Sequence, residues 1–182
     1  MKALKLSGIL PAFVIVGIIS GCSGTSTKSP DISDSIRTSF DQAGFKDVSI
    51  RQDRDKGVVT LGGRVAADAD KSQAESIARS LAGTQVVSNQ IAVVPPGLEK
   101  EAKAVNADLD DGIEKNLDAA LIEHGMHESA KYDVKNGVVT LTGEVNSQAK
   151  REAVEKLASR VPNVQQVVNE MQVKDQKASS SY

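Results

Sequence analysis

The stretch GVVTLGGRV at residues 57–65 returns as GVVTLTGEV at residues 137–145, eighty positions further along the chain. The match runs on without a gap to Val93 in the first copy and to Val173 in the second. Beyond the shared GVVTL, nine pairs of identical residues occur: Gly63/Gly143, Val65/Val145, Ala69/Ala149, Glu75/Glu155, Ala78/Ala158, Gln85/Gln165, Val87/Val167, Asn89/Asn169 and Val93/Val173. Since a gapless match of this length indicates a duplication, we predict two copies of one small module.

The repeated phrase is predicted to form the second strand of a β-hairpin. Asn136-Gly137 lies between two alternating runs, and both residues tolerate the positive φ that a tight hairpin turn requires. In the first copy, Lys56-Gly57 occupies the same place. The apolar residues of the following strand share one face, which predicts a sheet that covers a core on one side only: Val59, Leu61, Gly63 and Val65, and then Val139, Leu141, Gly143 and Val145.

The apolar spacing then changes from that of a strand to that of a helix. The helical face is predicted to comprise Ala74, Ile77, Ala78 and Leu81 in the first copy, and Ala153, Val154, Leu157, Ala158 and Val161 in the second. A last alternating strand follows in each copy, at residues 87–93 and 167–173. A further amphipathic helix precedes each hairpin, with apolar residues at Ile32, Ile36, Phe40 and Ala43, and at Leu109, Ile113, Leu117, Ala120 and Leu121.

These elements predict an α+β fold of two tandem αββαβ modules, each a three-stranded mixed sheet packed on two helices. The modules are assigned to residues 31–94 and 107–174, with a linker at 95–106 and a disordered polar tail at 175–182. The linker's last part, LEKEAKAV, is also able to extend the following helix. Because a module of about 65 residues is marginally stable alone, we expect the two modules to pack against each other.

Four glycines are predicted structural sites of the two hairpins. Gly57 and Gly137 lie in the turns, where positive φ is needed. Gly63 and Gly143 lie inside a strand, where glycine usually marks a bulge or a close approach of another backbone segment. A side chain at either strand position is therefore expected to be destabilising.

The first 22 residues, MKALKLSGILPAFVIVGIISGC, resemble an export signal rather than part of a fold. Lys2 and Lys5 precede an apolar run that is shorter than the roughly 20 residues of a membrane-spanning helix. The residues before Cys22 resemble the lipobox of bacterial lipoproteins, which implies a signal peptide at residues 1–21 and acyl chains, palmitate among them, on Cys22. The alternative is an ordinary secretory signal cut near Gly21, which would leave a free thiol.

The lipobox resemblance also implies a location. Ser23 follows the cysteine in place of the aspartate that retains such proteins in the inner membrane, so the periplasmic face of the outer membrane is expected, with residues 22–30 as a flexible tether. Without residues 1–21 the chain holds 20 basic and 24 acidic side chains (22 − 2 and 24 − 0), a net charge of −4. This balance argues against nucleic acid as a partner, because nucleic-acid binding depends on Lys and Arg neutralising phosphates.

The order αββαβ, the hairpin glycine, the GVVTL-x-G-x-V strand and the closing V-x-N-x-hydrophobic-x-V strand resemble the BON domain of bacterial envelope proteins. A lipobox followed by two such modules resembles the dual-BON outer-membrane lipoproteins. The resemblance implies a non-enzymatic role in membrane integrity or osmotic-stress tolerance, through contact with anionic phospholipid or envelope proteins. An alternative is a periplasmic protein that binds an ion or small ligand, or acts as a chaperone, and is merely localised by its lipid. The oligomeric state stays open.

Candidate catalytic and metal sites are weak in this sequence. His124 and His127 flank Gly125, which should end the helix between them, so we interpret this segment as a solvated helix end rather than a metal site. Asp68 and Asp70 lack the loop of ligands that calcium needs, and their place at a helix start is favoured by the helix dipole. With no histidine placed to support a nucleophile and no phosphate-binding glycine motif, we expect neither enzyme activity nor a cofactor.

Two helices are candidates for contact with a membrane surface. The long first helix of the second module is strongly acidic, with Asp108, Asp110, Asp111, Glu114, Asp118 and Glu123 against Lys115 alone, and would repel anionic headgroups. The second helix of this module carries a weak candidate contact surface of Lys150, Arg151, Lys156 and Arg160. Glu152 stands four residues before Lys156, so an ordinary ion-paired helix face explains these basic residues equally well.

Overall fold

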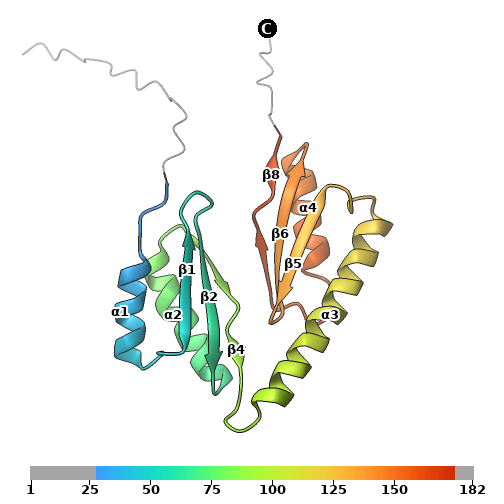
Figure 1. The fold of residues 1–182 in the computed structure, drawn as a ribbon. Coiled ribbons are helices and arrows are strands. Elements are labelled where there is room, and N and C mark those ends of the chain that lie inside the picture. Colours follow the sequence, from blue (N-terminus) through green and yellow to red (C-terminus); the bar gives the residue numbers. More distant parts are fainter. Residues whose placement is uncertain (1–27, 175–182) are drawn as a thin grey trace, which may run out of the picture.

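A computed structural model describes residues 28–174 and shows two modules in tandem (Figure 1). The predicted signal peptide, Cys22 and the polar tail lie outside the described residues. The first module contains α1 (Ser33–Ala43), β1 (Val48–Asp53), β2 (Val58–Val65), α2 (Asp68–Ala82), β3 (Val86–Asn89) and β4 (Ala92–Val93). The second contains α3 (Glu99–Glu123), β5 (Ala130–Lys135), β6 (Val138–Val145), α4 (Gln148–Ala158), β7 (Gln166–Asn169) and β8 (Gln172–Val173).

The sheets confirm the predicted αββαβ order and mixed topology. β1 pairs antiparallel with β2, and β2 pairs parallel with both β3 and β4. β5, β6, β7 and β8 repeat this arrangement in the second module. The predicted last strand is thus present in each module, but it is interrupted, at residues 90–91 and 170–171, and divided into two short pieces.

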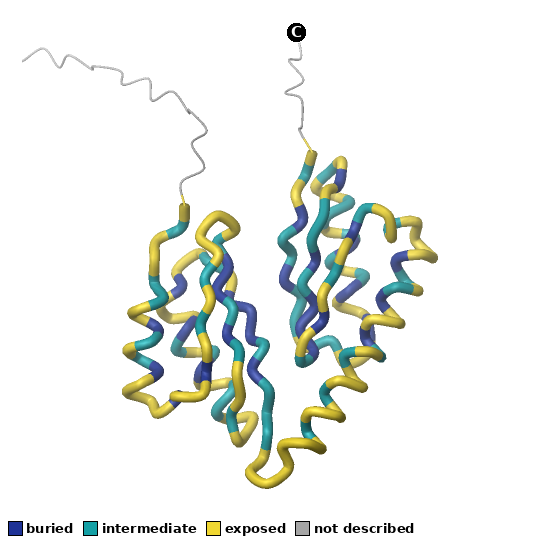
Figure 2. The backbone as a smooth tube through the Cα atoms, in the orientation of Figure 1, coloured by how far each residue is buried: buried dark blue, intermediate teal, exposed yellow. Residues whose placement is uncertain are grey.

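Each module has its own apolar core between one face of the sheet and its two helices (Figure 2). The core of the first module includes Ile36, Phe40, Val59, Leu61, Ala74, Ala78 and Ile91, and that of the second includes Ile113, Leu117, Leu121, Val139, Leu141, Val154, Ala158 and Met171. The opposite face of each sheet carries no helix (Figure 1). The prediction of a one-sided core is therefore confirmed.

The core face of α2 was predicted wrongly at one position. Leu81 is 37% exposed, and Ala82 is buried in its place. The buried residues Ala74, Ala78 and Ala82 are spaced four apart, and this narrow stripe of small side chains packs against the sheet. Leu81 lies about 100° away from Ala82 around the helix and turns towards solvent.

The hairpin loops differ between the modules. Asn136 and Gly137 have φ of 48° and 76°, as a two-residue turn of the primed type requires. In the first module the strands end at Asp53 and begin again at Val58, so the loop comprises residues 54–57, and Lys56-Gly57 does not form an equivalent two-residue turn. The longer loop is stabilised by the Asp53 carboxylate, which accepts hydrogen bonds from the backbone N–H groups of residues 55 and 56 (3.1 Å each).

Helix α3 is longer than the periodicity of the second module alone predicted. It begins at Glu99, so residues 99–106 of the predicted linker are helical. Its buried stripe starts only at Ile113, and Leu109, expected on the core face, is 43% exposed. Within residues 28–174, the apolar content of the helices falls short of what a bilayer-spanning segment needs.

Candidate functional site between the modules

The two modules contact each other along β3 and β7, which are edge strands of their sheets. Val58, Val138 and Val168 form a small buried apolar cluster there, on the sheet faces that carry no helices. Ser88, on β3, is also buried. The expected packing of the modules is confirmed, although the shared apolar surface comprises few side chains.

Most of the contact is polar. The Gln166 amide nitrogen donates to the Val87 carbonyl (2.7 Å), and its amide oxygen accepts from the Asn89 backbone N–H (3.0 Å). Asn136 Nδ2 donates to the carbonyl of Gln90 (2.7 Å). These three bonds join side chains of the second module to the backbone of the first.

An ion pair adds to this contact. Lys56 Nζ, in the hairpin loop of the first module, lies 2.5 Å from Glu170 Oε2, whose side chain is only 11% exposed. The hydrogen bond to Glu170, together with the negative charges of Glu170 and Asp53, raises the pKa of Lys56 above its ordinary value of 10.5. Lys56 is therefore fully charged at neutral pH.

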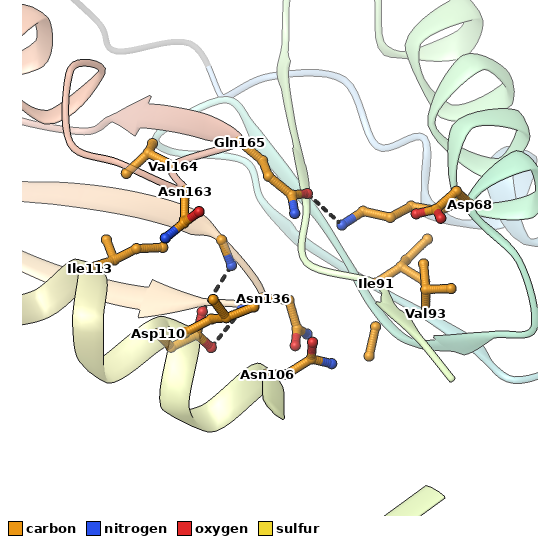
Figure 3. A pocket seen from close by; sticks show the side chains of 14 residues that line it. Asp68, Ile91, Val93, Asn106, Asp110, Ile113, Asn136, Asn163, Val164 and Gln165 are labelled. Atoms are coloured by element: carbon orange, nitrogen blue, oxygen red, sulfur yellow. Dashed lines mark hydrogen bonds between the residues drawn. The ribbon is translucent and has the colours of Figure 1, made fainter. Parts of the chain in front are cut away.

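Beside this contact lies a cavity of about 400 Å³, lined by residues of both modules (Figure 3). Lys71 from α2 reaches across it, and its Nζ donates to Gln165 Oε1 (3.1 Å). Burial lowers the pKa of Lys71 below its ordinary value, and the nearby acidic side chains only partly oppose this effect. Asn106, Asn163 and Asp68 complete the polar part of the lining. The cavity thus offers amide groups, one half-buried ammonium group and the carboxylates of Asp68 and Asp110.

Asp110 forms the other wall of this cavity and holds the second hairpin. Its two carboxylate oxygens accept hydrogen bonds from the backbone N–H groups of Asn136 (2.8 Å) and Gly137 (2.9 Å). Helix α3 is thereby tied to the turn between β5 and β6. The sequence pattern indicates only that Asp110 belongs to an acidic helix surface, because its hydrogen-bond partners lie in another element.

Asn89 and Asn169 were identified as repeated residues, but their role was missed. Asn89 Nδ2 donates to Glu75 Oε2 (2.9 Å) and to the Lys71 carbonyl, while its Oδ1 accepts from Ile91 N (3.3 Å). Asn169 makes the same set of bonds in the second module, to Glu155, Arg151 and Met171. Each asparagine therefore joins the interruption in the last strand to the preceding helix. The available signal for this role was that both the asparagine and the glutamate recur at equivalent positions of the two modules.

The four glycines adopt conformations that disfavour other residues. Gly57, Gly63, Gly137 and Gly143 all have positive φ. A Cβ atom on Gly63 would lie 2.1 Å from the Asp47 carbonyl oxygen, and one on Gly143 would lie 2.5 Å from that of Ser129. Real Cβ atoms essentially never show such short contacts, so the backbone just before β1 and β5 leaves room only for glycine.

The basic candidates, three on α4 and Arg160 just after its end, separate into two kinds. The Arg151 guanidinium donates to the carbonyls of Met171 (2.9 Å) and Asn169 (2.6 Å), so it stabilises the interrupted strand, and its role in a surface contact stays a prediction. Lys156 and Arg160 are exposed and Lys150 is half-buried. Glu152 accepts a hydrogen bond from Gln148 (2.9 Å).

The two histidines lie at the end of α3, as expected. His124 Nδ1 is 2.9 Å from the Ala120 carbonyl oxygen, and His127 Nε2 is 3.0 Å from Asp118 Oδ1. Among residues 28–174, no three His, Cys, Asp or Glu side chains gather in a way suited to a metal ion.

A family model of the BON domain matches residues 28–95 and 109–175, which are the two modules. The chain therefore belongs to the BON-domain family. It is 29% identical over 136 residues to osmotically-inducible protein Y of Escherichia coli (strain K12). The match covers 74% of this chain and 66% of that relative, slightly less than two thirds of the relative's length.

Two solved structures from Chlamydia trachomatis also show similarity. One is the C-terminal domain of CdsD, a structural protein of the type III secretion system, with 16% identity, a TM-score of 0.35 and coverage of 82% of this chain and 100% of that chain. The other, also of CdsD, has 17% identity, a TM-score of 0.35 and coverage of 79% and 92%.

Proposed function

We propose that this chain is a non-enzymatic envelope protein that acts by contact and supports outer-membrane integrity or osmotic-stress tolerance. The observation that carries the proposal is the match of both modules to the BON domain, since these modules make up nearly all of the described chain. The similarity to a protein named for osmotic induction favours the link to osmotic stress.

The proposed location is the periplasmic face of the outer membrane, with acyl chains on Cys22 as the anchor. Each buried CH₂ group of an acyl chain contributes about 0.8 kcal/mol, and stable anchoring generally requires more than one chain. The modules themselves then need no affinity for lipid to stay at the membrane.

We favour envelope proteins over anionic phospholipid as the partners. Asp108, Asp111, Glu114 and Glu123 are exposed along α3. A surface of this charge is repelled by anionic headgroups over distances of about 8 Å at physiological ionic strength. In the candidate basic surface, the exposed residues are Lys156, on α4, and Arg160, just after the end of this helix.

Liposome flotation and palmitate labelling test this proposal. The wild-type chain expressed in a bacterial host should incorporate labelled palmitate and float with vesicles of either neutral or anionic lipid. The Cys22→Ser variant should do neither. Flotation of Cys22→Ser with anionic vesicles at low salt would instead show direct lipid recognition, and an unlabelled wild-type chain would rule out the lipid anchor.

A second candidate function is the binding of a small polar solute, favoured by the cavity between the modules and by the half-buried Lys71 that spans it. A solute that binds only the folded chain must raise its melting temperature, and the rise must continue with the logarithm of the solute concentration above the dissociation constant. Thermal shifts across simple ions and osmolytes test this candidate. A shift that is present in the wild type and lost in Lys71→Met would place the solute in this cavity.

A further inference from the structure

The outer edge of β3 is occupied in an unusual way. β3 is an edge strand. The N–H groups of Val86 and Gln90 point towards β2 and donate to the carbonyls of Gly57 and Leu61. The Val87 carbonyl and the Asn89 N–H consequently point outward, where an edge strand normally exposes groups that pair with another strand. In this structure both groups bond to one side chain, Gln166.

The Gln166 side chain reproduces the hydrogen bonds of a strand residue. In a parallel ladder, one residue donates to the carbonyl before its partner and accepts from the N–H after it. The carboxamide of Gln166 does both, around Ser88, at 2.7 Å and 3.0 Å. It therefore marks the position that a peptide group of an extended chain would take alongside β3.

The inter-module contact that covers this edge can be replaced by contact with another chain. It consists mainly of side-chain hydrogen bonds and one ion pair, with an apolar cluster of only three valines. Such hydrogen bonds contribute only modestly to the free energy of the contact, because water or another peptide replaces them at little cost. The repeat-equivalent position in the first module is Val86, which is 47% exposed and has no carboxamide, so this arrangement belongs to the second module alone.

We propose that β3 is a binding edge for an extended segment of another polypeptide, which pairs with the backbone at residues 86–89 after displacing Gln166. Main-chain hydrogen bonds would supply the affinity, as in other cases of strand addition. The second module then acts as a removable cover. This inference deepens the proposed contact function by naming the chemistry of the partner, and it is tested on purified protein, so that its failure leaves the anchoring proposal untouched.

The test uses the full chain in detergent solution and a fluorescent peptide of alternating Thr and Val, flanked by Lys, of about eight residues, which is the length of a strand. Fluorescence anisotropy measures binding. Gln166→Ala should bind the peptide roughly five- to tenfold more tightly than the wild type, because the competing carboxamide is gone. Gln148→Ala is the matched control, since the exposed Gln148 carboxamide bonds to Glu152 of its own helix α4, and it should match the wild type.

A second peptide distinguishes backbone pairing from other binding. The same sequence with alternate amide nitrogens methylated has lost its donors on one edge, and it should not bind. Equal binding of both peptides, equal affinity of wild type and Gln166→Ala, or dimerisation of Gln166→Ala without peptide binding would each overturn the proposal. If Gln166→Ala fails to fold, the amide NMR signals of residues 87–89 in the wild type provide the readout, and they must shift on saturation with the unmethylated peptide.

Discussion

At the scale of single residues, polar side chains recur at equivalent positions of the two modules just as apolar ones do. Asn89 and Asn169 each satisfy the backbone at a strand interruption while holding a glutamate of the preceding helix. Polar side chains that are largely removed from water need such partners, because an unpaired one costs free energy. The two asparagines therefore fix where the last strand bends in each module.

Asn169→Ala should lower the free energy of unfolding by about 1–3 kcal/mol, because Met171 N–H and the Glu155 carboxylate both lose a partner. Urea denaturation followed by circular dichroism measures this change. Lys156→Ala, an exposed change on α4, serves as the control and should have little effect. Similar losses in the two variants would argue against a role for Asn169 in stability.

Gly143→Val should destabilise the chain by more than about 3 kcal/mol, since a side chain there combines strained φ of 117° with a clash against the Ser129 carbonyl. Thr142→Val, at the adjacent half-buried position, should change stability by only about 0.5 kcal/mol. The comparison is made by thermal melting of both variants. Equal melting temperatures would show that the glycine position is unremarkable.

At the scale of elements, α3 shows how a helix serves two purposes. Its C-terminal half supplies the core residues Ile113, Leu117 and Leu121, as the sequence period predicts. Its middle supplies Asp110, which holds the hairpin turn of β5 and β6. Charge-assisted bonds of this kind are stronger than those between neutral groups. The helix therefore positions the hairpin turn, and the turn places Asn136 against the first module.

Asp110→Ala should reduce the free energy of unfolding by about 2 kcal/mol, because two backbone N–H groups lose a charged acceptor. Asp111→Ala removes an exposed carboxylate from the same helix and is expected to be nearly neutral. Chemical denaturation of both variants provides the comparison. If Asp111→Ala proves as harmful as Asp110→Ala, general helix charge rather than the turn contact explains the loss.

At the scale of the whole molecule, the two modules are joined by polar contacts across the edges of their sheets. The ion pair of Lys56 with Glu170 and the bonds of Gln166 and Asn136 carry this junction. A contact of this type is weaker than a shared apolar core, which fits a protein whose modules separate when a partner binds. Independent tumbling of the two halves in NMR relaxation, without any partner, would contradict the packing described above.

The Lys56 contact should persist over the physiological pH range. Because the pKa of Lys56 is raised in the folded chain, its contribution is fully present below pH 10.5 and is lost as pH rises through the raised value. The stability difference between wild type and Lys56→Gln should therefore stay constant from neutral pH to about 10 and shrink above 10.5. A difference that already disappears near neutral pH would assign the effect to another group.

The sequence by itself determined the duplication, the αββαβ order, most of the two cores and the special place of the strand glycines. These features are local, because the period of apolar residues and the freedom of glycine act within a few neighbouring positions. Some local predictions from the sequence were wrong. Leu81 was predicted on the core face of its helix, but Ala82 packs on the sheet instead. Lys56-Gly57 was predicted as a two-residue turn, but Asp53 stabilises a longer loop.

Only the tertiary structure decided which backbone groups Gln166, Asn136, Asp110 and Arg151 contact. A polar side chain looks the same in the sequence whether it meets water, a turn or the edge of a distant strand. Its partner is set by the packing of whole elements, and the hydrogen bond it forms exists only once that packing is complete.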